Sequence, residues 1–332
     1  MRIAINGFGR IGRIAYRSLR QHGSDMDLVA VNDLTDARTL AHLLERDSVH
    51  GRLDAAVEAS AGRIQVGDDA IEVLSEKDPS RLPWGDLDID VVIESTGRFR
   101  DREQAAQHLT AGARKVIISA PGKSSDITVV MGVNQESITG EHDVISNASC
   151  TTNCVATMAK VVLETAGWVH GLMTTTHAYT ASQHMLDTPD KDLRRARAGA
   201  LSLIPTTTGA AKAAAMVLPE LKGKIDGMAI RVPIPDVSLV DLTVEVERTT
   251  TVEAINEAFR QAAGGPLAGF LAVSDEPLVS VDYVTTTESA TVDALSTAVL
   301  DGTLVKVLAW YDNEMGYATR LIDLADYLKK FL

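Results

Sequence analysis

The chain of 332 residues is predicted to be an α/β protein in which a domain with a parallel sheet precedes an α+β domain with a mostly antiparallel sheet. Two observations predict this fold class. The first half alternates short apolar runs with helical patterns, which is typical of βαβ units. The second half carries long runs of alternating polarity, such as LVDLTVEVE at 239–247 and TLVKVLAWY at 303–311, which indicate antiparallel strands with one covered face.

The individual elements follow from these patterns in chain order. In the first half we expect strands at 3–6, 28–32, 90–95 and 115–119, helices at 11–22, 36–46 and 101–112, and a hairpin at 63–74 that turns at Gly67-Asp68. In the second half we expect helices at 150–165, 210–218, 252–262 and 316–330. The domain boundary should fall near Cys150, where the strand DVIS meets a helix.

Composition and charge exclude several classes of protein. A hydrophobic fraction of 45% and a charged fraction of 23% are ordinary for a soluble globular protein. A net charge of -13 argues against nucleic acid as the main partner, and no apolar run is long enough for a membrane span. The N-terminal residues form a strand and a glycine-rich turn rather than a signal peptide, so we expect a reducing cytoplasm, where the two thiols stay free.

A glycine-rich motif near the N-terminus predicts a dinucleotide site. Gly7-Phe8-Gly9-Arg10-Ile11-Gly12 is a GxGxxG that follows a strand and opens a helix, the context in which backbone amides hold a pyrophosphate. Asp33 lies 21 residues past Gly12, after the second strand, where a carboxylate binds the ribose hydroxyls of NAD and repels the 2′-phosphate of NADP. We therefore predict a Rossmann-type domain that binds NAD; the alternative is a tight turn without a ligand.

The only two cysteines lie four residues apart in the stretch NASCTTNC at 147–154. A disulfide within one helical turn would be strained, and no matching Cys or His pair completes a metal site. For either cysteine alone, burial in the core is the ordinary interpretation. Small polar residues place Cys150 at a helix N-terminus, which favours the thiolate, so we predict that Cys150 is a nucleophile and Cys154 a buried neighbour.

A thiol nucleophile requires a base, and His177 is the candidate. It ends the apolar run GLMTTTH, which indicates a strand. A single histidine at a strand end is more often structural, but Cys–His is a recurring activated pair. Neither spacing nor composition shows that the two residues meet in space.

Seven motifs, two of which include the stretches described above, give the chain a resemblance, over essentially its whole length, to the glyceraldehyde-3-phosphate dehydrogenase family. They are INGFGRIGR at 5–13, VNDLTD at 31–36, ESTGRF at 94–99, ASCTTNC at 148–154, IPTTTGAAKA at 204–213, VLPELKGK at 217–224 and WYDNE at 310–314. The resemblance implies phosphorylating oxidation of glyceraldehyde 3-phosphate to 1,3-bisphosphoglycerate with NAD, through a hemithioacetal and a thioester on Cys150. His177 would serve as acid and base.

The resemblance also implies binding residues, domains and partners. The residues implied for the substrate phosphate and for inorganic phosphate are Ser149, Thr151, Thr180, Arg195, Thr208, Gly209 and Arg231. For Thr208, plain N-capping of the following helix is an alternative that is compatible with this role. The cofactor residues implied are Gly7, Gly9, Arg10, Ile11, Gly12, Asp33, Lys77, Ser119, Asn313 and Tyr317, without a metal. The family pattern further implies an NAD-binding domain at 1–149, with helix 314–332 packing back on it, a catalytic domain at 150–313, and a homotetramer with the loop after His177 at a subunit interface.

The sequence departs from the common bacterial pattern mainly in that loop. HSYTNDQ reads HAYTASQ at 177–183, LDLPHKD reads LDTPDKD at 186–192, and RVPTPN reads RVPIPD at 231–236. The resemblance implies that position 188, where Thr188 replaces a leucine, lies near the adenosine ribose and helps to exclude NADP. Several other changed positions would flank the substrate pocket. These changes suggest the hypothesis of a paralogue that tolerates thiol-reactive inhibitors. Erythrose-4-phosphate dehydrogenase, a secondary redox-sensing role of the thiol and a Cys–His hydrolase are the alternatives.

Overall fold

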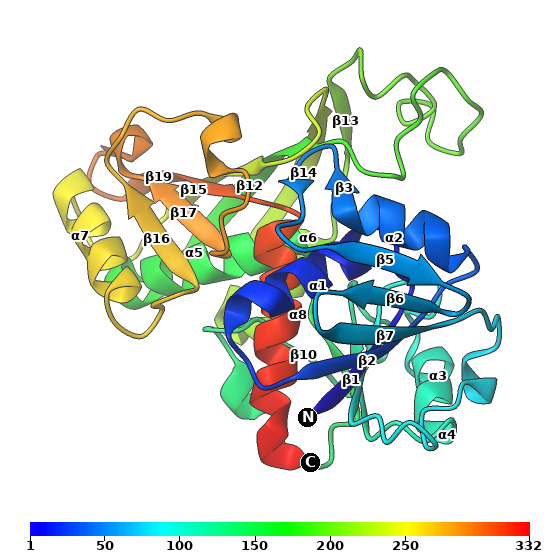
Figure 1. The fold of residues 1–332 in the computed structure, drawn as a ribbon. Coiled ribbons are helices and arrows are strands. Elements are labelled where there is room, and N and C mark those ends of the chain that lie inside the picture. Colours follow the sequence, from blue (N-terminus) through cyan, green and yellow to red (C-terminus); the bar gives the residue numbers. More distant parts are fainter. The chain divides into compact units, whose positions relative to one another are not determined.

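The computed structural model describes residues 1–332, which form two compact units. Unit 1 comprises Met1–Val129, Gln135–Ala148 and Ala318–Leu332, and unit 2 comprises Val130–Asn134 and Ser149–Tyr317. Unit 1 is built on a nine-stranded sheet and unit 2 on an eight-stranded sheet (Figure 1). The first sheet is mostly parallel and the second mostly antiparallel, which confirms the predicted fold class.

The sheet of unit 1 has the strand order β10-β11-β9-β8-β1-β2-β7-β6-β5. Its strands are β1 (Arg2–Asn6), β2 (Asp27–Asn32), β5 (Val57–Ser60), β6 (Arg63–Val66), β7 (Asp69–Leu74), β8 (Val91–Glu94), β9 (Lys115–Ile118), β10 (Ile127–Thr128) and β11 (Val144–Ser146). The central strands are parallel and almost fully buried. Because β1 lies between β2 and β8, the sheet has its topological switch point at β1, where α/β sheets bind their ligands.

The helices of unit 1 connect and cover these strands. They are α1 (Arg10–His22), α2 (Ala37–Glu45), α3 (Arg102–Ala105), α4 (Gln107–Thr110) and the part of α8 (Met315–Leu328) from Ala318 onward, with short 3-10 turns at Pro79–Arg81, Gln135–Ser137 and Lys329–Phe331. Asp36 caps α2 by accepting a hydrogen bond from the Thr39 amide. Ser18 of α1 lies 2.9 Å from Thr319 of α8 through their hydroxyl oxygens, which links the two helices within unit 1.

One predicted helix is interrupted. We expected a single helix at 101–112, and the structure has two short helices that meet at Ala106. The Leu109 amide donates to the Ala106 carbonyl at 3.0 Å, an i to i+3 bond that tightens the backbone into 3-10 geometry. The predicted hairpin at 63–74 is confirmed: β6 and β7 pair antiparallel around Gly67, whose φ of 58° suits a tight turn.

The sheet of unit 2 has the order β13-β14-β12-β15-β19-β17-β16, and β18 pairs with β19. Its strands are β12 (His170–Ala178), β13 (Ile204–Thr207), β14 (Ile225–Val232), β15 (Ser238–Glu245), β16 (Leu271–Ser274), β17 (Ala290–Asp293), β18 (Ala298–Leu300) and β19 (Leu304–Tyr311). The alternating burial of β12, β15 and β19 confirms the polarity pattern seen in the sequence. A separate ribbon of β3 (Arg46–Asp47) and β4 (Gly51–Arg52) belongs to unit 1.

Three helices cover the sheet of unit 2. They are α5 (Cys150–Ala166), α6 (Ala210–Val217) and α7 (Val252–Ala263), with 3-10 turns at Pro219–Leu221, Ser280–Tyr283 and Ala294–Ser296. The α5 helix packs against β15, β17 and β19 as well as against α6 and α7 (Figure 1). It is buried along most of its length, so the residues at its first turn are held firmly over the sheet.

Candidate active site

Cys150 is the first residue of α5. Ser149 precedes it with extended backbone angles, and its hydroxyl accepts a hydrogen bond from the Thr152 amide at 3.1 Å. This side-chain cap begins the helix at Cys150 and leaves amides of the first turn free to face an anion. Cys154, one turn further along α5, is fully buried and lies 3.8 Å from the Met158 sulfur, as expected of a core residue.

His177 lies beside the thiol. It occupies the end of β12, is 4% exposed, and its Nε2 atom lies 3.5 Å from Cys150 Sγ. Both cysteines are free. The structure therefore brings together two residues whose proximity the sequence alone could not show, and it gives the thiol a base within reach.

Two groups contact the other ring nitrogen of His177. Nδ1 lies 2.7 Å from the Ala178 carbonyl oxygen and 2.7 Å from NH1 of Arg231. A proton on Nδ1 is donated to the carbonyl, and Nε2 then accepts the thiol proton. When Nδ1 instead accepts from Arg231, Nε2 carries the proton and donates it toward the sulfur. The surroundings thus support both directions of proton transfer between His177 and Cys150.

The electrostatics differ from the prediction that the helix start would favour the thiolate. Desolvation raises the pKa of Cys150, although the charge of Arg231 and the hydrogen bonds of Thr151 act in the opposite direction. Burial and then the Arg231 charge lower the pKa of His177 to about 3. The substrate-free pair is therefore a neutral thiol beside a neutral imidazole, because desolvation outweighs the stabilisation of an anion by the helix.

Arg231 and Arg195 are the two predicted phosphate ligands that carry a guanidinium group. Neither guanidinium has a carboxylate partner, and the Nε atom of each is buried without a hydrogen-bond partner. Burial lowers the pKa of Arg231, and the charge of Arg195 adds to this effect, so the two groups are near enough to repel. Arg195 donates to Ser182 Oγ at 2.9 Å, and that oxygen lies 2.9 Å from Thr180 Oγ1. Two uncompensated guanidinium groups suit a phosphate.

The remaining predicted phosphate ligands lie at the starts of α5 and α6, which pack together. Thr208 Oγ1 accepts from the Ala210 amide at 3.2 Å, but Thr208 is not the N-cap of α6, because it lies one residue before the N-cap Gly209. Gly209 is the N-cap of α6 without a side-chain cap, and a Cβ there would meet nothing within 4 Å. Thr151 Oγ1 lies 2.8 Å from Tyr311 Oη, so this hydroxyl faces the protein and the Thr151 amide is the better donor for an anion.

Tyr311 is a site residue that the sequence reasoning missed. It is 2% exposed at the end of β19, and its hydroxyl lies 2.8 Å from both Thr151 Oγ1 and Thr175 Oγ1. Its ring also lies edge-on to the His177 ring, with centroids 6.0 Å apart. The inward-facing position at the end of an alternating strand was the available signal. Tyr311 thus contacts both α5, which carries Cys150, and β12, which carries His177.

The glycine motif of unit 1 has the shape that a pyrophosphate requires. Gly7 has φ +91°, and a Cβ there would lie 2.6 Å from the Thr96 amide nitrogen. A Cβ on Gly12 would lie 2.4 Å from the Gly7 carbonyl oxygen, whereas a Cβ on Gly9 would meet nothing. Gly9 begins α1 without a side-chain cap, and no acid lies in the first turn, which includes Ile11. The loop leaves space at Gly9, so a pyrophosphate of a dinucleotide could approach the start of α1 closely.

The other predicted cofactor residues of unit 1 lie along the same sheet edge. Arg10 differs from them, because its side chain is paired with a carboxylate. Asp33 follows β2 and accepts from the Phe8 amide at 2.9 Å, and Ser119 follows β9 with a hydroxyl that has no partner. The Lys77 amide donates to the Glu76 side chain at 2.7 Å. The Arg10 guanidinium binds Asp47 with two bonds of 2.8 and 3.1 Å, so its charge is directed to that carboxylate.

Asn313 and Tyr317, also predicted to contact the cofactor, lie in unit 2. Asn313 Oδ1 accepts a hydrogen bond from Ser238 Oγ at 2.6 Å, and the same serine oxygen accepts from the Ala178 amide at 3.1 Å. Because the serine proton is committed to Asn313, the orientation of that side-chain amide is fixed. Tyr317 is 6% exposed near the start of α8.

An NAD-type glycine loop on a parallel sheet, together with a Cys–His pair, defines the class of oxidoreductases that work through a cysteine nucleophile. Residues 1–102 match the family model "Glyceraldehyde 3-phosphate dehydrogenase, NAD binding domain", and residues 149–313 match the corresponding C-terminal domain. The chain belongs to the glyceraldehyde-3-phosphate dehydrogenase family. It is an NAD-dependent oxidoreductase that acts on an aldehyde.

Full-length relatives support this assignment. The chain is 60% identical to glyceraldehyde-3-phosphate dehydrogenase of Geobacillus stearothermophilus over 99% of this chain and 98% of that protein. It is 57% identical to glyceraldehyde-3-phosphate dehydrogenase 1 of Bacillus cereus over 98% of each chain. Identity to glyceraldehyde-3-phosphate dehydrogenase 2 of Streptomyces avermitilis is 54% over 99% of this chain and 98% of that protein. No helix in the structure has the length and apolar character needed to cross a membrane.

Proposed function

We propose that this protein oxidises glyceraldehyde 3-phosphate to 1,3-bisphosphoglycerate while NAD is reduced. The observation that carries the proposal is the contact of 3.5 Å between Cys150 Sγ and His177 Nε2, beside the uncompensated guanidinium groups of Arg195 and Arg231. A nucleophile, a base and a phosphate site are the three groups that such a reaction requires. The names of the full-length relatives support the same substrate.

In the first half of the reaction, Cys150 Sγ bonds to the aldehyde carbon while its proton passes to His177 Nε2. The amide of Cys150 stabilises the developing oxyanion, which His177 then protonates to give a hemithioacetal. His177 next removes the hydroxyl proton as the carbon is oxidised to a thioester. Bound NAD supplies the acceptor for the hydride that leaves this carbon. Burial and the Arg231 charge lower the pKa of His177, so the imidazole is neutral before substrate binds and has a nitrogen available to accept a proton.

In the second half, inorganic phosphate attacks the thioester carbon, the carbon–sulfur bond breaks, and the acyl phosphate leaves. Cys150 departs as a thiolate and regains a proton from His177, which restores the starting state. We propose that the phosphate groups are bound by Arg195, Arg231 and Thr180 and by the first turns of α5 and α6, at Ser149, Thr151, Thr208 and Gly209. Arg231 also offsets the negative charge of the departing thiolate, since its charge lowers the pKa of Cys150.

We propose further that the chain works as a homotetramer, with residues 185–203 at an interface between copies. Large apolar side chains are exposed there, among them Met185 at 83%, Leu193 at 81% and Leu201 at 80%. Such a cluster on a soluble enzyme fits association with a second copy. Sedimentation equilibrium should give four times the chain mass of 35.5 kDa, and L193D/L201D should dissociate the assembly. A monomeric wild type would refute this proposal.

We also propose a cytoplasmic location, because the free thiols of such an enzyme persist in a reducing compartment.

The altered loop supports a narrower proposal, that the thiol resists small electrophiles. Ser182 and Ala181 stand where the common bacterial pattern has Asp and Asn, and Ser182 contacts Arg195. The inactivation rate by a small epoxide, compared with the Bacillus cereus relative, tests the idea. Equal rates would eliminate it.

The proposed reaction is tested by following NADH formation. The assay compares glyceraldehyde 3-phosphate with erythrose 4-phosphate, NAD with NADP, and buffers with and without inorganic phosphate. We expect turnover that depends on phosphate and on NAD, with a higher kcat/KM for the three-carbon aldehyde. Cys150→Ser should remove nearly all activity while the circular dichroism spectrum is unchanged. Retained activity in that variant, or a preference for the four-carbon aldehyde, would contradict the proposal.

A further inference from the structure

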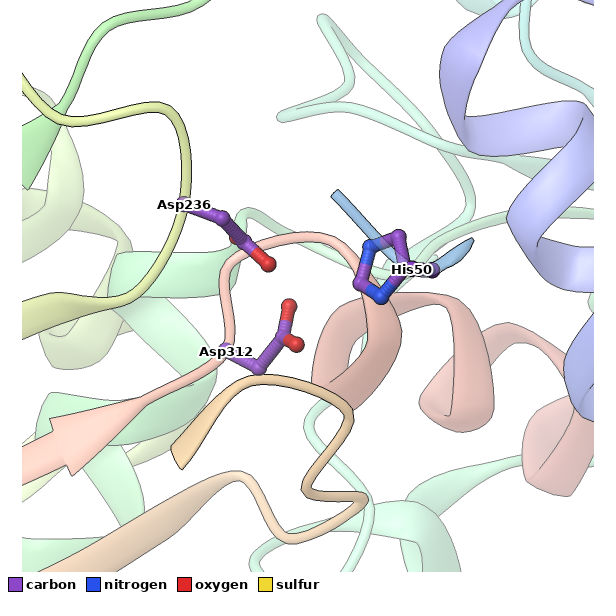
Figure 2. A group of neighbouring side chains, drawn as sticks. All are labelled: His50, Asp236 and Asp312. Atoms are coloured by element: carbon purple, nitrogen blue, oxygen red, sulfur yellow. The ribbon is translucent and has the colours of Figure 1, made fainter. Parts of the chain in front are cut away.

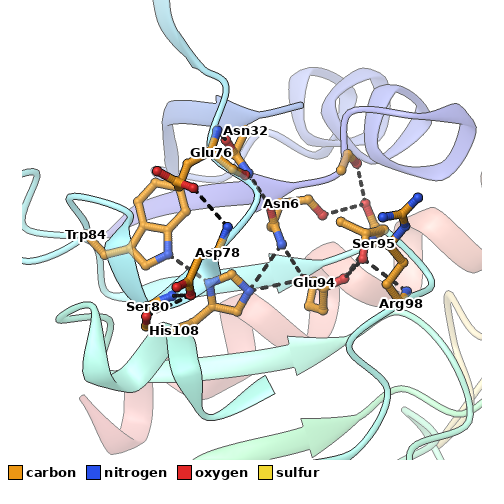
Figure 3. A network of polar contacts seen from close by, with 12 residues as sticks. Asn6, Asn32, Glu76, Asp78, Ser80, Trp84, Glu94, Ser95, Arg98 and His108 are labelled. Carbon is orange, nitrogen blue, oxygen red and sulfur yellow. Dashed lines mark hydrogen bonds and ion pairs between the residues drawn. The ribbon is translucent and has the colours of Figure 1, made fainter. Parts of the chain in front are cut away.

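A buried polar network lies behind the cofactor edge of unit 1, and the proposed reaction does not use it (Figure 3). Asn6, Asn32 and Glu94 are the last residues of β1, β2 and β8, and they are 1%, 5% and 2% exposed. The residues that follow the first two strands are Gly7 and Asp33, both assigned to the cofactor. The network therefore joins the strand ends from which the cofactor edge projects.

Glu94 is the centre of this network. Its Oε2 atom accepts from Asn6 Nδ2 at 2.5 Å and lies 3.1 Å from His108 Nε2. Its Oε1 atom accepts from the Thr96 amide at 2.9 Å and from the Thr96 hydroxyl at 2.5 Å. No lysine or arginine contacts the carboxylate. Four donors surround it instead, as a buried carboxylate requires.

Trp84 fixes the direction of the hydrogen bonds at one end. The indole N–H of Trp84 is a donor only, and it lies 2.9 Å from His108 Nδ1. Nδ1 must therefore accept, so the imidazole carries its proton on Nε2 and donates it to Glu94. His108 is fully buried, and its Nε2 atom also lies 3.3 Å from Asn6 Nδ2.

The backbone of Glu76 fixes the direction at the other end. Asn32 Oδ1 accepts from the Glu76 amide at 2.8 Å, and Asn32 Nδ2 donates to the Glu76 carbonyl at 2.9 Å. Asn32 Nδ2 also donates to Asn6 Oδ1 at 2.7 Å. Asn6 is thereby turned so that its Nδ2 points at Glu94. Asn6 cannot turn an acceptor toward Glu94 without losing its bond from Asn32, and His108 cannot do so without losing its bond from Trp84.

We propose that Glu94 is a positioning residue for NAD. Its Oε2 atom must accept from Asn6 and His108, so its Oε1 atom must also be an acceptor if it is to hold the turn at Thr96 against the glycine loop. The turn and the loop are in contact: Ser95 Oγ donates to the Gly7 carbonyl at 2.6 Å, and the Thr96 amide nitrogen would lie 2.6 Å from a Cβ on Gly7. The inference rests on the proposed placement of NAD at this edge. Glu94 acts through the turn and the loop and does not itself touch the cofactor.

An isosteric change separates hydrogen bonding from shape. In E94Q one carboxylate oxygen becomes an NH2 group. Because Asn6 and His108 are held as donors, the remaining oxygen must face them, and the new NH2 then faces the Thr96 amide N–H. The turn loses its acceptor, although the volume of the side chain is unchanged.

The test uses the full-length protein after removal of bound NAD. We expect E94Q to weaken NAD binding, measured by titration calorimetry, by about tenfold, equivalent to about 1.4 kcal/mol. Hydrogen exchange at the Thr96 amide should accelerate in the cofactor-free protein, a readout independent of activity. Alkylation of Cys150 by iodoacetamide should be unchanged. The control is E72Q, on β7 of the same sheet, where the carboxylate makes no hydrogen bond, and it should match the wild type in all three measurements.

A second variant tests whether the network acts as a unit. N32D places acceptors against the Asn6 and Glu76 oxygens, and β1 separates it from the Thr96 turn. We expect faster exchange at Thr96 and weaker NAD binding, with losses in N32D/E94Q that are smaller than the sum of the single losses. If E94Q does not fold, exchange at Thr96 in N32D decides the matter.

Unchanged NAD affinity or unchanged Thr96 exchange in E94Q would overturn the inference, as would strictly additive losses in the double variant. The proposed function fails in a different experiment: a wild type that binds NAD but does not oxidise glyceraldehyde 3-phosphate would refute the reaction and leave the role of Glu94 standing. A wild type that does not bind NAD would refute both.

Discussion

Arg231 lies directly opposite His177 in the parallel pairing of β14 with β12. Its NH1 nitrogen lies 2.7 Å from His177 Nδ1 and 3.0 Å from the Ala178 carbonyl oxygen. One guanidinium therefore sets the charge beside the imidazole and also presents a free Nε donor for an anion. Binding of an anionic substrate there would offset the very charge that depresses the pKa of His177, so substrate binding and proton transfer are linked.

The first prediction follows from this linkage. Burial and the Arg231 charge lower the pKa of His177 to about 3, so Arg231→Gln should raise this pKa toward its usual range. The pKa is measured by NMR titration of isotope-labelled imidazole. Because a charged phosphate ligand is also lost, kcat/KM should fall roughly 10- to 100-fold. Arg63→Gln, at an exposed arginine on β6 of unit 1, should change neither quantity. A His177 pKa that stays near 3 in Arg231→Gln would contradict the assigned cause.

The second prediction concerns Tyr311, whose hydroxyl serves Thr151 and Thr175 at once. Tyr311→Phe leaves two buried threonine hydroxyls short of a partner, so the free energy of unfolding should fall by about 1–3 kcal/mol. The loss is measured by urea denaturation, and kcat should fall with it because Thr151 adjoins the nucleophile. Tyr327→Phe, where the hydroxyl makes no hydrogen bond, is the matched control and should be neutral. Equal stabilities of the two variants would show that the Tyr311 hydroxyl contributes nothing.

The third prediction uses two glycines of one loop that differ in their surroundings. At Gly9 the backbone has φ -73°, and a Cβ would meet nothing within 4 Å. Gly9→Ala should therefore keep the melting temperature of the wild type, yet weaken NAD binding at least tenfold, because the methyl group enters the space where the pyrophosphate approaches the helix.

Gly7→Ala should lose both properties, since φ is +91° and the new Cβ would lie 2.6 Å from the Thr96 nitrogen. The comparison needs calorimetric NAD titration and thermal denaturation of both variants. Wild-type NAD affinity in Gly9→Ala would place the pyrophosphate elsewhere.

Local signals in the sequence were enough for most of the elements, but not for contacts across the sheet. Ser149 caps α5 as a small polar residue before a helix should, and the Gly67 turn follows from its residue type. The meeting of His177 with Arg231 depends on the pairing of β12 with β14, which no local pattern specifies. The hydrogen bonds at the helix start lower the pKa of Cys150 as expected, but burial raises it by more, and no local pattern specifies that burial.

The fourth prediction concerns Asp236, which stands where the common pattern has asparagine. Burial, followed by the charges of Asp312 and Glu314, raises its pKa from 3.8 to about 9. Asp312 accepts from the amides of Thr285, Glu314 and Met315 at 2.7 to 2.8 Å, and Figure 2 shows its carboxylate facing that of Asp236. Asp236 therefore keeps its proton in the folded chain.

Between pH 4 and 9 the folded chain holds this proton while the unfolded chain has released it, so rising pH favours unfolding through this window. Asp236→Asn removes the titration without changing the shape of the side chain. Its advantage in unfolding free energy over the wild type should therefore grow with pH, by at least ~1.4 kcal/mol between pH 5 and pH 9, the linkage of one pH unit. Urea denaturation at both pH values measures it, and Asp86→Asn, at an exposed carboxylate without a hydrogen bond, should show no such trend. An advantage that stays constant with pH would mean that Asp236 is ionised in the folded protein, and its contact with Asp312 would then need another source of compensation.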